Sequence, residues 1–181
     1  GKVHEDFVVL KGIEYDTYDA GHIICIMPEG VKMRLLEIKG LPVSVLIDFV
    51  HRHGGILGPA HPCGEKYLSF AHTKKFYKSP EIIKRFDFIE GFNACEPEES
   101  NAGAMKLAMK YKKPAIGGSD SHKLDCVSLA YTELPERVTC ETELISLIRS
   151  KVPIGVGGTI YGKTTKDKIG KANKLLVYSF W

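Results

Sequence analysis

The chain repeats one pattern: a short run of apolar residues, a polar or glycine-marked corner, and then a stretch with helical spacing. The clearest example is residues 41–53, where apolar residues at 43, 46, 47 and 50 predict one buried face of a helix. Gly54-Gly55 ends that helix, and residues 56–60 return as a strand. Alternating strands and helices are typical of α/β proteins. We therefore expect an α/β fold.

The same pattern predicts the other strands and helices of the chain. We expect further strands at 7–14, 22–27, 88–92, 114–118 and 127–134, and further helices at 79–86, 101–112 and 140–151. The first two of these strands are continuously apolar, which indicates burial on both faces. Residues 155–159 resemble a loop, and 164–176 a lysine-rich helix before an apolar ending.

Length and composition restrict the class of protein. The 181 residues suit one ordinary domain or a large part of a bigger one. No run approaches the roughly 20 apolar residues of a membrane span, and the first residues lack the apolar core of a secretory signal. The 5 cysteines are an odd number without a Cys-x-x-Cys pair. We therefore expect a cytoplasmic protein with reduced thiols and no membrane contact.

The net charge of +3 is concentrated near the C-terminus, where lysines recur from Lys151 to Lys174. A solvated helix face is the ordinary explanation of such a run, and a phosphate-rich ligand is the alternative. A charge of this size does not exclude contact with nucleic acid.

Protonatable residues gather at the ends of the expected strands. Glu14, His61 and the pair Asp120 and His122 each follow a strand, and His22 opens one or lies in the preceding turn. Active sites of α/β folds lie at the carboxyl ends of the strands. Histidine with Asp and Glu, without thiolates, is a ligand set for Zn²⁺, Mn²⁺ or Fe. Each residue taken alone is better explained as a turn residue or a helix cap, but their conjunction favours a metal site.

Three motifs in this order resemble those of the PHP (polymerase and histidinol phosphatase) domain, a family of metal-dependent phosphoesterases. They are Gly12-Ile13-Glu14, Gly54-Gly55 followed by Ala60-His61-Pro62, and Gly118-Ser119-Asp120-Ser121-His122. The resemblance covers roughly residues 7–152. It implies a distorted (β/α)7 TIM-like barrel that holds two or three divalent ions.

The resemblance also implies roles for single residues. Glu14 would be a bridging carboxylate, His22 and His61 ligands of one ion, Asp120 a ligand of a second, and His122 a ligand of the second or third. His61 or His122 would also be catalytic, by protonating the leaving alkoxide. The implied function is hydrolysis of a phosphate ester of a small metabolite or nucleotide by metal-activated water.

The chain departs from the family pattern at its start. PHP domains begin with a His-x-His strand and an Asp-His strand, but here only 13 residues precede Glu14. We therefore expect a barrel lacking its first two strands in this chain, an N-terminally incomplete PHP-like domain at 1–152, and a basic segment at 153–181. The alternative function is a non-catalytic remnant that acts as a metal-binding or interaction module. An open sheet edge would favour a homo-oligomer.

A competing motif lies at residues 157–164, which fit the G-x-x-x-x-G-K-[ST] phosphate loop. Only 17 residues follow it, too few for the strand that holds Mg²⁺ in nucleotide hydrolases, so this interpretation is weaker.

Other polar residues have ordinary explanations. We expect the acidic cluster that follows the strand at 88–92 to be a solvated loop, and His51 and His53 to complement the end of a helix. His72, in the polar insertion after His61, could instead close over a substrate. The acidic cluster comprises Glu90, Glu96, Glu98 and Glu99.

Overall fold

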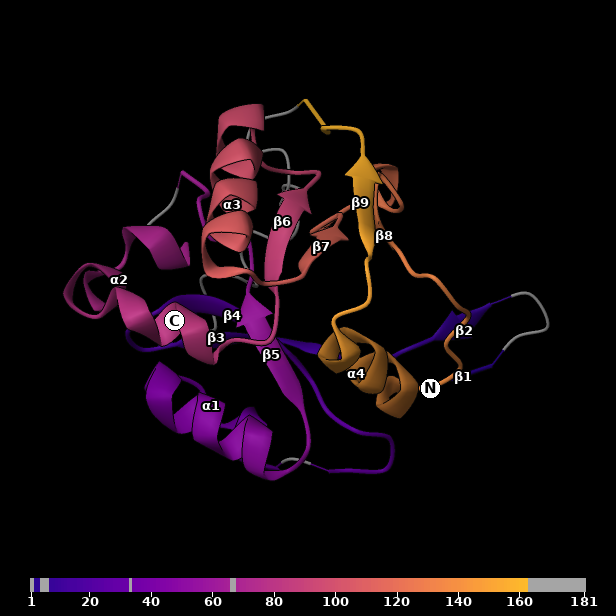
Figure 1. Ribbon diagram of the computed structural model, residues 1–181, viewed down its shortest axis with the longest axis horizontal. Helices are drawn as coiled ribbons and strands as arrows, with labels where there is room; N and C mark the ends of the chain where they lie inside the picture. Colours follow the sequence, from indigo (N-terminus) through magenta and orange to yellow (C-terminus); the bar gives the residue numbers. More distant parts are fainter. Residues whose placement is uncertain (1, 4–6, 33, 66–67, 163–181) are drawn as a thin grey trace.

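The structure is a computed structural model that describes residues 2–3, 7–32, 34–65 and 68–162. These residues form short strands, α-helices and 3-10 helices in a mixed α/β arrangement (Figure 1), which confirms the expected class. The expected helix at 164–176 and the apolar ending lie outside the described residues. Among the residues described, no helix combines the length and apolar character needed to cross a bilayer.

The first larger sheet is antiparallel, in the order β3-β4-β5, and comprises β3 (Ile13–Thr17), β4 (Gly21–Ile26) and β5 (Ile56–Pro59). The predicted single strand at 7–14 is wrong. Its first part, β2 (Val8–Val9), pairs instead with β1 (Lys2–Val3) in a separate hairpin. The second strand was also expected to be buried on both faces, but β4 alternates between buried and half-buried residues. This alternation is typical of an antiparallel strand with one face on the core.

A parallel pair follows, made of β6 (Ile89–Asn93) and β7 (Ala115–Gly118), with α3 (Glu98–Tyr111) as the crossover between them. In Figure 1, α3 lies alongside β6. Parallel strands need such a crossover, so the predicted strand-helix-strand unit is confirmed.

The last sheet pairs β8 (Ala130–Glu133) with β9 (Gly155–Gly158) in antiparallel fashion, and α4 (Glu141–Ser150) connects them. The predicted loop at 155–159 is therefore wrong. Its glycines fit a strand because the neighbouring chain approaches closely: the Tyr131 side chain lies against Gly157, Glu133 against Gly155, and the Leu129 and Ala130 backbone against Gly158. Gly157 and Gly158, which open the phosphate-loop motif, pair with β8 and form no cradling loop.

The described strands do not close into a barrel, so the expected TIM-like barrel is not shown. Hydrogen bonds connect neighbouring sheets among the described residues. The backbone N–H of Asp87 donates to the Leu57 carbonyl over 2.8 Å, between β5 and β6. The N–H of Gly117 donates to Thr132 Oγ1 over 2.9 Å, between β7 and β8.

The main core forms between α1 (Val43–Arg52) and the first larger sheet. The predicted face of α1 is confirmed, because Val43, Leu46, Ile47 and Val50 are all fully buried. Burial of each such side chain stabilises the fold by about 1.5–3 kcal/mol. The core anchors β4, which carries the candidate ligand His22, and β5, which precedes the candidate ligand His61.

The segment between β5 and β6 carries only short helices: η2 (Phe70–His72), α2 (Lys74–Lys78) and η3 (Pro80–Arg85). The helix expected at 79–86 is a 3-10 helix that begins with Pro80, as predicted for its first position. Two further 3-10 turns are η1 (Arg34–Glu37) and η4 (Leu124–Cys126). All 5 cysteines are described, and none is in a disulfide bond.

Candidate metal centre

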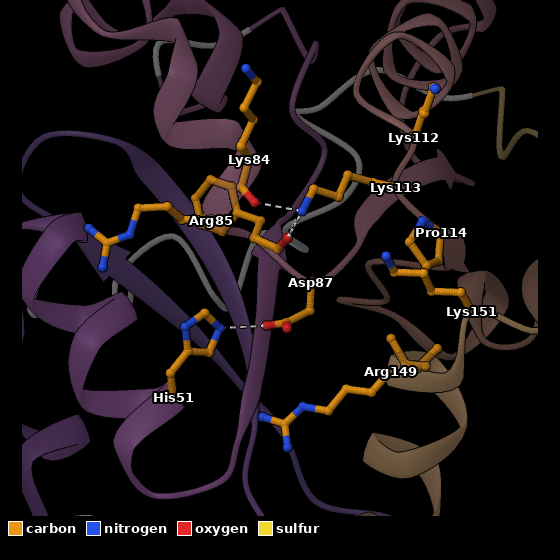
Figure 2. A pocket seen from close by; sticks show the side chains of 11 residues that line it. His51, Lys84, Arg85, Asp87, Lys112, Lys113, Pro114, Arg149 and Lys151 are labelled. Carbon is orange, nitrogen blue, oxygen red and sulfur yellow. Dashed lines mark hydrogen bonds and ion pairs between the residues drawn. The ribbon is translucent and has the colours of Figure 1, made fainter.

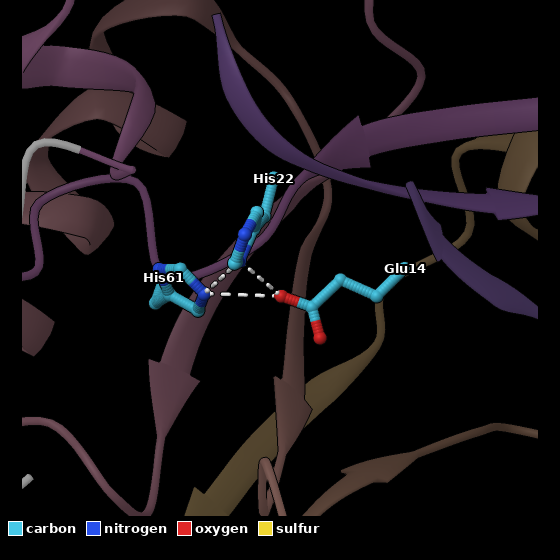
Figure 3. A group of neighbouring side chains, drawn as sticks. All are labelled: Glu14, His22 and His61. Carbon is cyan, nitrogen blue, oxygen red and sulfur yellow. Dashed lines mark hydrogen bonds and ion pairs between the residues drawn. The ribbon is translucent and has the colours of Figure 1, made fainter. Parts of the chain in front are cut away.

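Three of the predicted ligands meet in one group: Glu14, His22 and His61 (Figure 3). One ligand atom from each lies within 4.8 Å of the other two. Glu14 Oε1 is 2.8 Å from His22 Nδ1 and 3.2 Å from His61 Nε2. The two imidazole nitrogens are 3.4 Å apart.

The hairpin of β3 and β4 brings Glu14 and His22 together. Glu14 pairs with Ile24 and Asp16 with His22, so period-2 alternation places Glu14 and His22 diagonally on one face. The prediction that Glu14 ends a strand is wrong, because it is the second residue of β3. Gly21 at the turn has a φ of 72° and no space for a side chain beside the Leu68 carbonyl.

His61 follows β5 with a φ of 30°, in a backbone region that non-glycine residues seldom adopt. Its N–H donates to Glu90 Oε2 over 2.6 Å, and its Nδ1 lies 3.2 Å from Ser69 Oγ. The Ser69 contact leaves Nε2 facing Glu14. Metal-binding histidines are usually oriented in this way through their second ring nitrogen.

Burial and charge act in opposite directions on the ionisable groups here. Burial tends to raise the pKa of Glu14, but hydrogen bonds from His22 and His61 lower it well below its usual range. Burial tends to lower the pKa of His61, but Glu14, Glu90 and Asp120 raise it above its ordinary value. The ion-free group therefore holds the Glu14 carboxylate against the His61 imidazole, whose affinity for a proton is raised.

Glu90 is the residue that sequence reasoning missed. The prediction of a solvated loop is wrong for Glu90, because this residue lies in β6 and is 4% exposed. Its Oε2 also accepts from Asn93 Nδ2 over 3.0 Å. Burial raises the pKa of Glu90 to about 7. The available signal was a carboxylate inside the apolar run 88–92, since carboxylates are almost never buried without partners.

Asp120 lies at the edge of this group. It follows β7 with a φ of 47°, and its Oδ2 accepts from Asn93 Nδ2 over 3.4 Å. Its side chain is 10% exposed. Asp120 therefore connects to the centre through Asn93 and through its charge on His61, and it is not one of the three converging ligands.

His122 stands further out, with a side chain that is 42% exposed. Its Nδ1 lies 3.0 Å from the Asp120 carbonyl and 3.4 Å from Asp120 Oδ1. The structure thus brings His122 to Asp120 but does not include it in the group of Glu14, His22 and His61.

Three other histidines of the described residues lie outside this group. His51 Nε2 bonds Asp87 over 2.9 Å, and His53 Nδ1 lies 2.8 Å from the Phe49 carbonyl, both near the end of α1. His72 lines a cleft of about 1040 Å³. The cleft also reaches Asp16, whose Oδ1 is 4.0 Å from His22 Nε2.

The comparisons with known proteins agree with one part of this picture. Residues 98–153 match a family model described as PHP-associated. The match runs from α3 past α4 and includes Asp120 and His122, and it confirms the predicted relation to PHP proteins. No curated protein matches the chain significantly. The segment with Glu14, His22 and His61 lies outside the matched range.

Proposed function

We propose that the chain is a metal-dependent phosphoesterase that hydrolyses a phosphate ester of a small metabolite or nucleotide. The observation that carries this proposal is the convergence of Glu14, His22 and His61 within 4.8 Å. The PHP-associated match supports the same class of chemistry.

The residues fit a divalent ion. One carboxylate oxygen and two imidazole nitrogens suit Zn²⁺, Mn²⁺ or Fe, and soft thiolate ligands are absent from this described group. Ser69 contacts the second ring nitrogen of His61, and Glu90 accepts from its backbone N–H. Contacts to the second ring nitrogen are usual for metal-binding histidines. Asp120 lies near enough to act electrostatically on His61, and we assign it to a second ion.

An ion held here supplies Lewis acidity, which lowers the pKa of a coordinated water and polarises a phosphoryl oxygen. Glu14, His22 and His61 hold that ion, so none of them is available to donate a proton. We assign proton donation to the leaving alkoxide to His122, which is half-exposed and has Asp120 to orient its ring.

The substrate enters, in our proposal, through the cleft beside His22. Lys74, Lys75 and His72 line this cleft, and cations there complement a phosphate ester. Tyr18 also lines it with 81% of its surface exposed, which leaves the ring available for contact with the organic part of the ester.

We also propose that the separate sheets are arcs of one PHP-type barrel. The bonds from Asp87 to Leu57 and from Gly117 to Thr132 join β5 to β6 and β7 to β8 in barrel order. Among the described strands β3 pairs with β4 alone, so its other side is the edge at which a further strand would extend the barrel.

The test is turnover of p-nitrophenyl phosphate by the purified chain with Mn²⁺ or Zn²⁺. We expect metal-dependent release of p-nitrophenol that His61→Ala abolishes and that His53→Ala, a histidine outside the group, leaves unchanged. Equal activity of wild type and His61→Ala would contradict the proposal.

A second function, a metal-binding module without turnover, is favoured by one observation. Asp120 and His122 stand outside the three-ligand group, so the described residues complete a site for one ion only. Binding of a single ion without hydrolysis of p-nitrophenyl phosphate would select this function.

A further inference from the structure

A basic pocket of about 460 Å³ lies at the end of β6 and β7 opposite to the candidate metal centre. Asp87 precedes β6 and Pro114 directly precedes β7, whereas Asn93 ends β6 and Asp120 follows β7. Because the two strands are parallel, these positions mark opposite ends of the same pair. The cations that line the pocket are Lys84, Arg85, Lys112, Lys113, Arg149 and Lys151.

The cations come from chain segments that are far apart in the sequence. Lys112 and Lys113 follow α3, and Arg149 and Lys151 belong to the last turn and the end of α4. Figure 2 shows Lys113, Arg149 and Lys151 arranged around Asp87. A helix C-terminus attracts cations, but here two such ends converge on one concavity.

Two of the cations already have acidic partners. Lys84 pairs with Glu81, and Arg85 pairs with Asp48. In Figure 2 their side chains extend away from Asp87. Within the described part of the chain, no carboxylate lies in ion-pair contact with the remaining four, Lys112, Lys113, Arg149 and Lys151.

Backbone carbonyls hold two of these four in place without cancelling their charge. Lys113 Nζ donates to the carbonyl of Lys84 over 2.7 Å and to that of Phe86. Arg149 Nη2 donates to the Gly55 carbonyl over 2.9 Å. These bonds fix both cations at the pocket, which reduces the entropy lost when a ligand binds.

The single carboxylate of the pocket is already engaged. Asp87 Oδ2 accepts from Leu57 N–H over 2.9 Å and lies 2.9 Å from His51 Nε2. Burial lowers the pKa of Lys113; nearby Lys151 lowers it further, while Asp87 opposes the change. Because Lys112, Lys113, Arg149 and Lys151 outnumber this one carboxylate, the pocket keeps an excess of positive charge.

We propose that this pocket binds a small multivalent phosphate, of the class of pyrophosphate or a nucleoside polyphosphate, at a site separate from the metal centre. A concave site of this volume suits a small molecule. Arginine and lysine held in fixed positions recognise phosphate oxygens through charge-assisted hydrogen bonds. The group of described residues that could hold an ion lies at the other end of the strands, so the ligand is bound here without being hydrolysed.

The test removes charge without straining the backbone. Lys112 and Lys151 have φ values of 53° and 58°, a region that glycine adopts more readily than lysine. The double variant Lys112→Gly with Lys151→Gly therefore keeps the fold while removing two cations. Its matched control is Lys106→Gln with Arg137→Gln, which removes two exposed cations that do not line the pocket.

Binding of pyrophosphate is measured by titration calorimetry at low ionic strength, where charge interactions are least screened. EDTA is present so that no metal centre contributes. We expect the pocket variant to bind at least about a hundredfold more weakly than wild type, since it loses two charge-assisted hydrogen bonds and each is equivalent to about tenfold or more in affinity. We expect the control pair and His61→Ala to bind like wild type.

Three results would overturn the proposal. The first is no binding of pyrophosphate by wild type, and the second is an equal loss in the pocket variant and the control pair. The third is that a short single-stranded oligonucleotide displaces pyrophosphate and binds more tightly than both pyrophosphate and a nucleoside polyphosphate such as ATP. That result would make the pocket part of a nucleic-acid surface. Because the metal centre takes no part in the titration, these results are independent of the proposed hydrolysis.

Discussion

The backbone N–H of His61 donates a 2.6 Å hydrogen bond to the buried carboxylate of Glu90. This bond ties a candidate ligand on one sheet to a strand of the next. It holds His61 in the left-handed conformation from which its ring reaches Glu14.

Replacing Glu90 by alanine should therefore weaken both the fold and the metal centre. The N–H of His61 and the amide of Asn93 lose their buried acceptor, which costs about 1–3 kcal/mol for each group left unpaired. We expect a lower free energy of unfolding in urea and weaker Zn²⁺ binding. Glu98→Ala, an exposed glutamate at the start of α3, should change neither quantity, and equal effects of the two variants would contradict this role.

The raised pKa of Glu90 predicts a specific pH dependence. Burial raises its pKa from 4.5 to about 7 in the folded protein, so the folded state binds the proton more tightly than the unfolded state. The free energy of unfolding of the ion-free protein should therefore fall as the pH rises from 4.5 to 7. Chemical denaturation across this range should show the fall in wild type and a smaller one in Glu90→Gln. The same slope in both would assign the dependence to other groups, such as His61.

Gly118 has a packing requirement set by the same carboxylate. A Cβ at this position would overlap Glu90 Oε1, whereas a Cβ at Gly12 would make ordinary contacts. Gly118→Ala should displace Glu90 and cost about 1–3 kcal/mol. Gly12→Ala should be close to neutral in the same thermal unfolding measurement. Comparable stability of the two variants would show that Glu90 can move freely.

Two valines of α1 offer a matched test of the core. Val50 is fully buried, while Val45 is 45% exposed on the same helix. Val50→Ala should lower the free energy of unfolding by about 2 kcal/mol, since it removes buried apolar area and leaves a cavity. Val45→Ala should change it by less than about 0.5 kcal/mol. The difference is measured by urea denaturation, and its absence would contradict the assigned core.

The sequence predicted α1, α3, α4 and the parallel unit because their signals are local. Apolar residues at 43, 46, 47 and 50 define one face of α1, and all are buried. The antiparallel pairing of β3 with β4 was not predictable in the same way, since both runs read as apolar and the pairing depends on the turn at Gly21. Strand β9 was missed because glycines weaken the strand signal, and the close approach of β8 residues such as Tyr131 and Glu133 that accounts for them exists only in the fold.

For the candidate site, the motifs identified residue types better than positions. Glu14, His22 and His61 converge although Glu14 does not end its strand. Glu90 was missed because a glutamate near other acidic residues in the sequence is typical of a solvated loop. Only the fold places its carboxylate beside the backbone N–H of His61. That Asp120 and His122 bind an ion stays a prediction. Their spacing in the sequence accounts for their contact with each other but not for a contact with the other ligands.

The central claim is that Glu14, His22 and His61 form a metal site, and the most direct test is metal content. Wild type, His61→Ala and the control His53→Ala are loaded with Zn²⁺, dialysed and analysed by mass spectrometry for bound metal. The account predicts at least one tightly bound ion in wild type and in His53→Ala, and its loss in His61→Ala. Unchanged metal content in His61→Ala would contradict it.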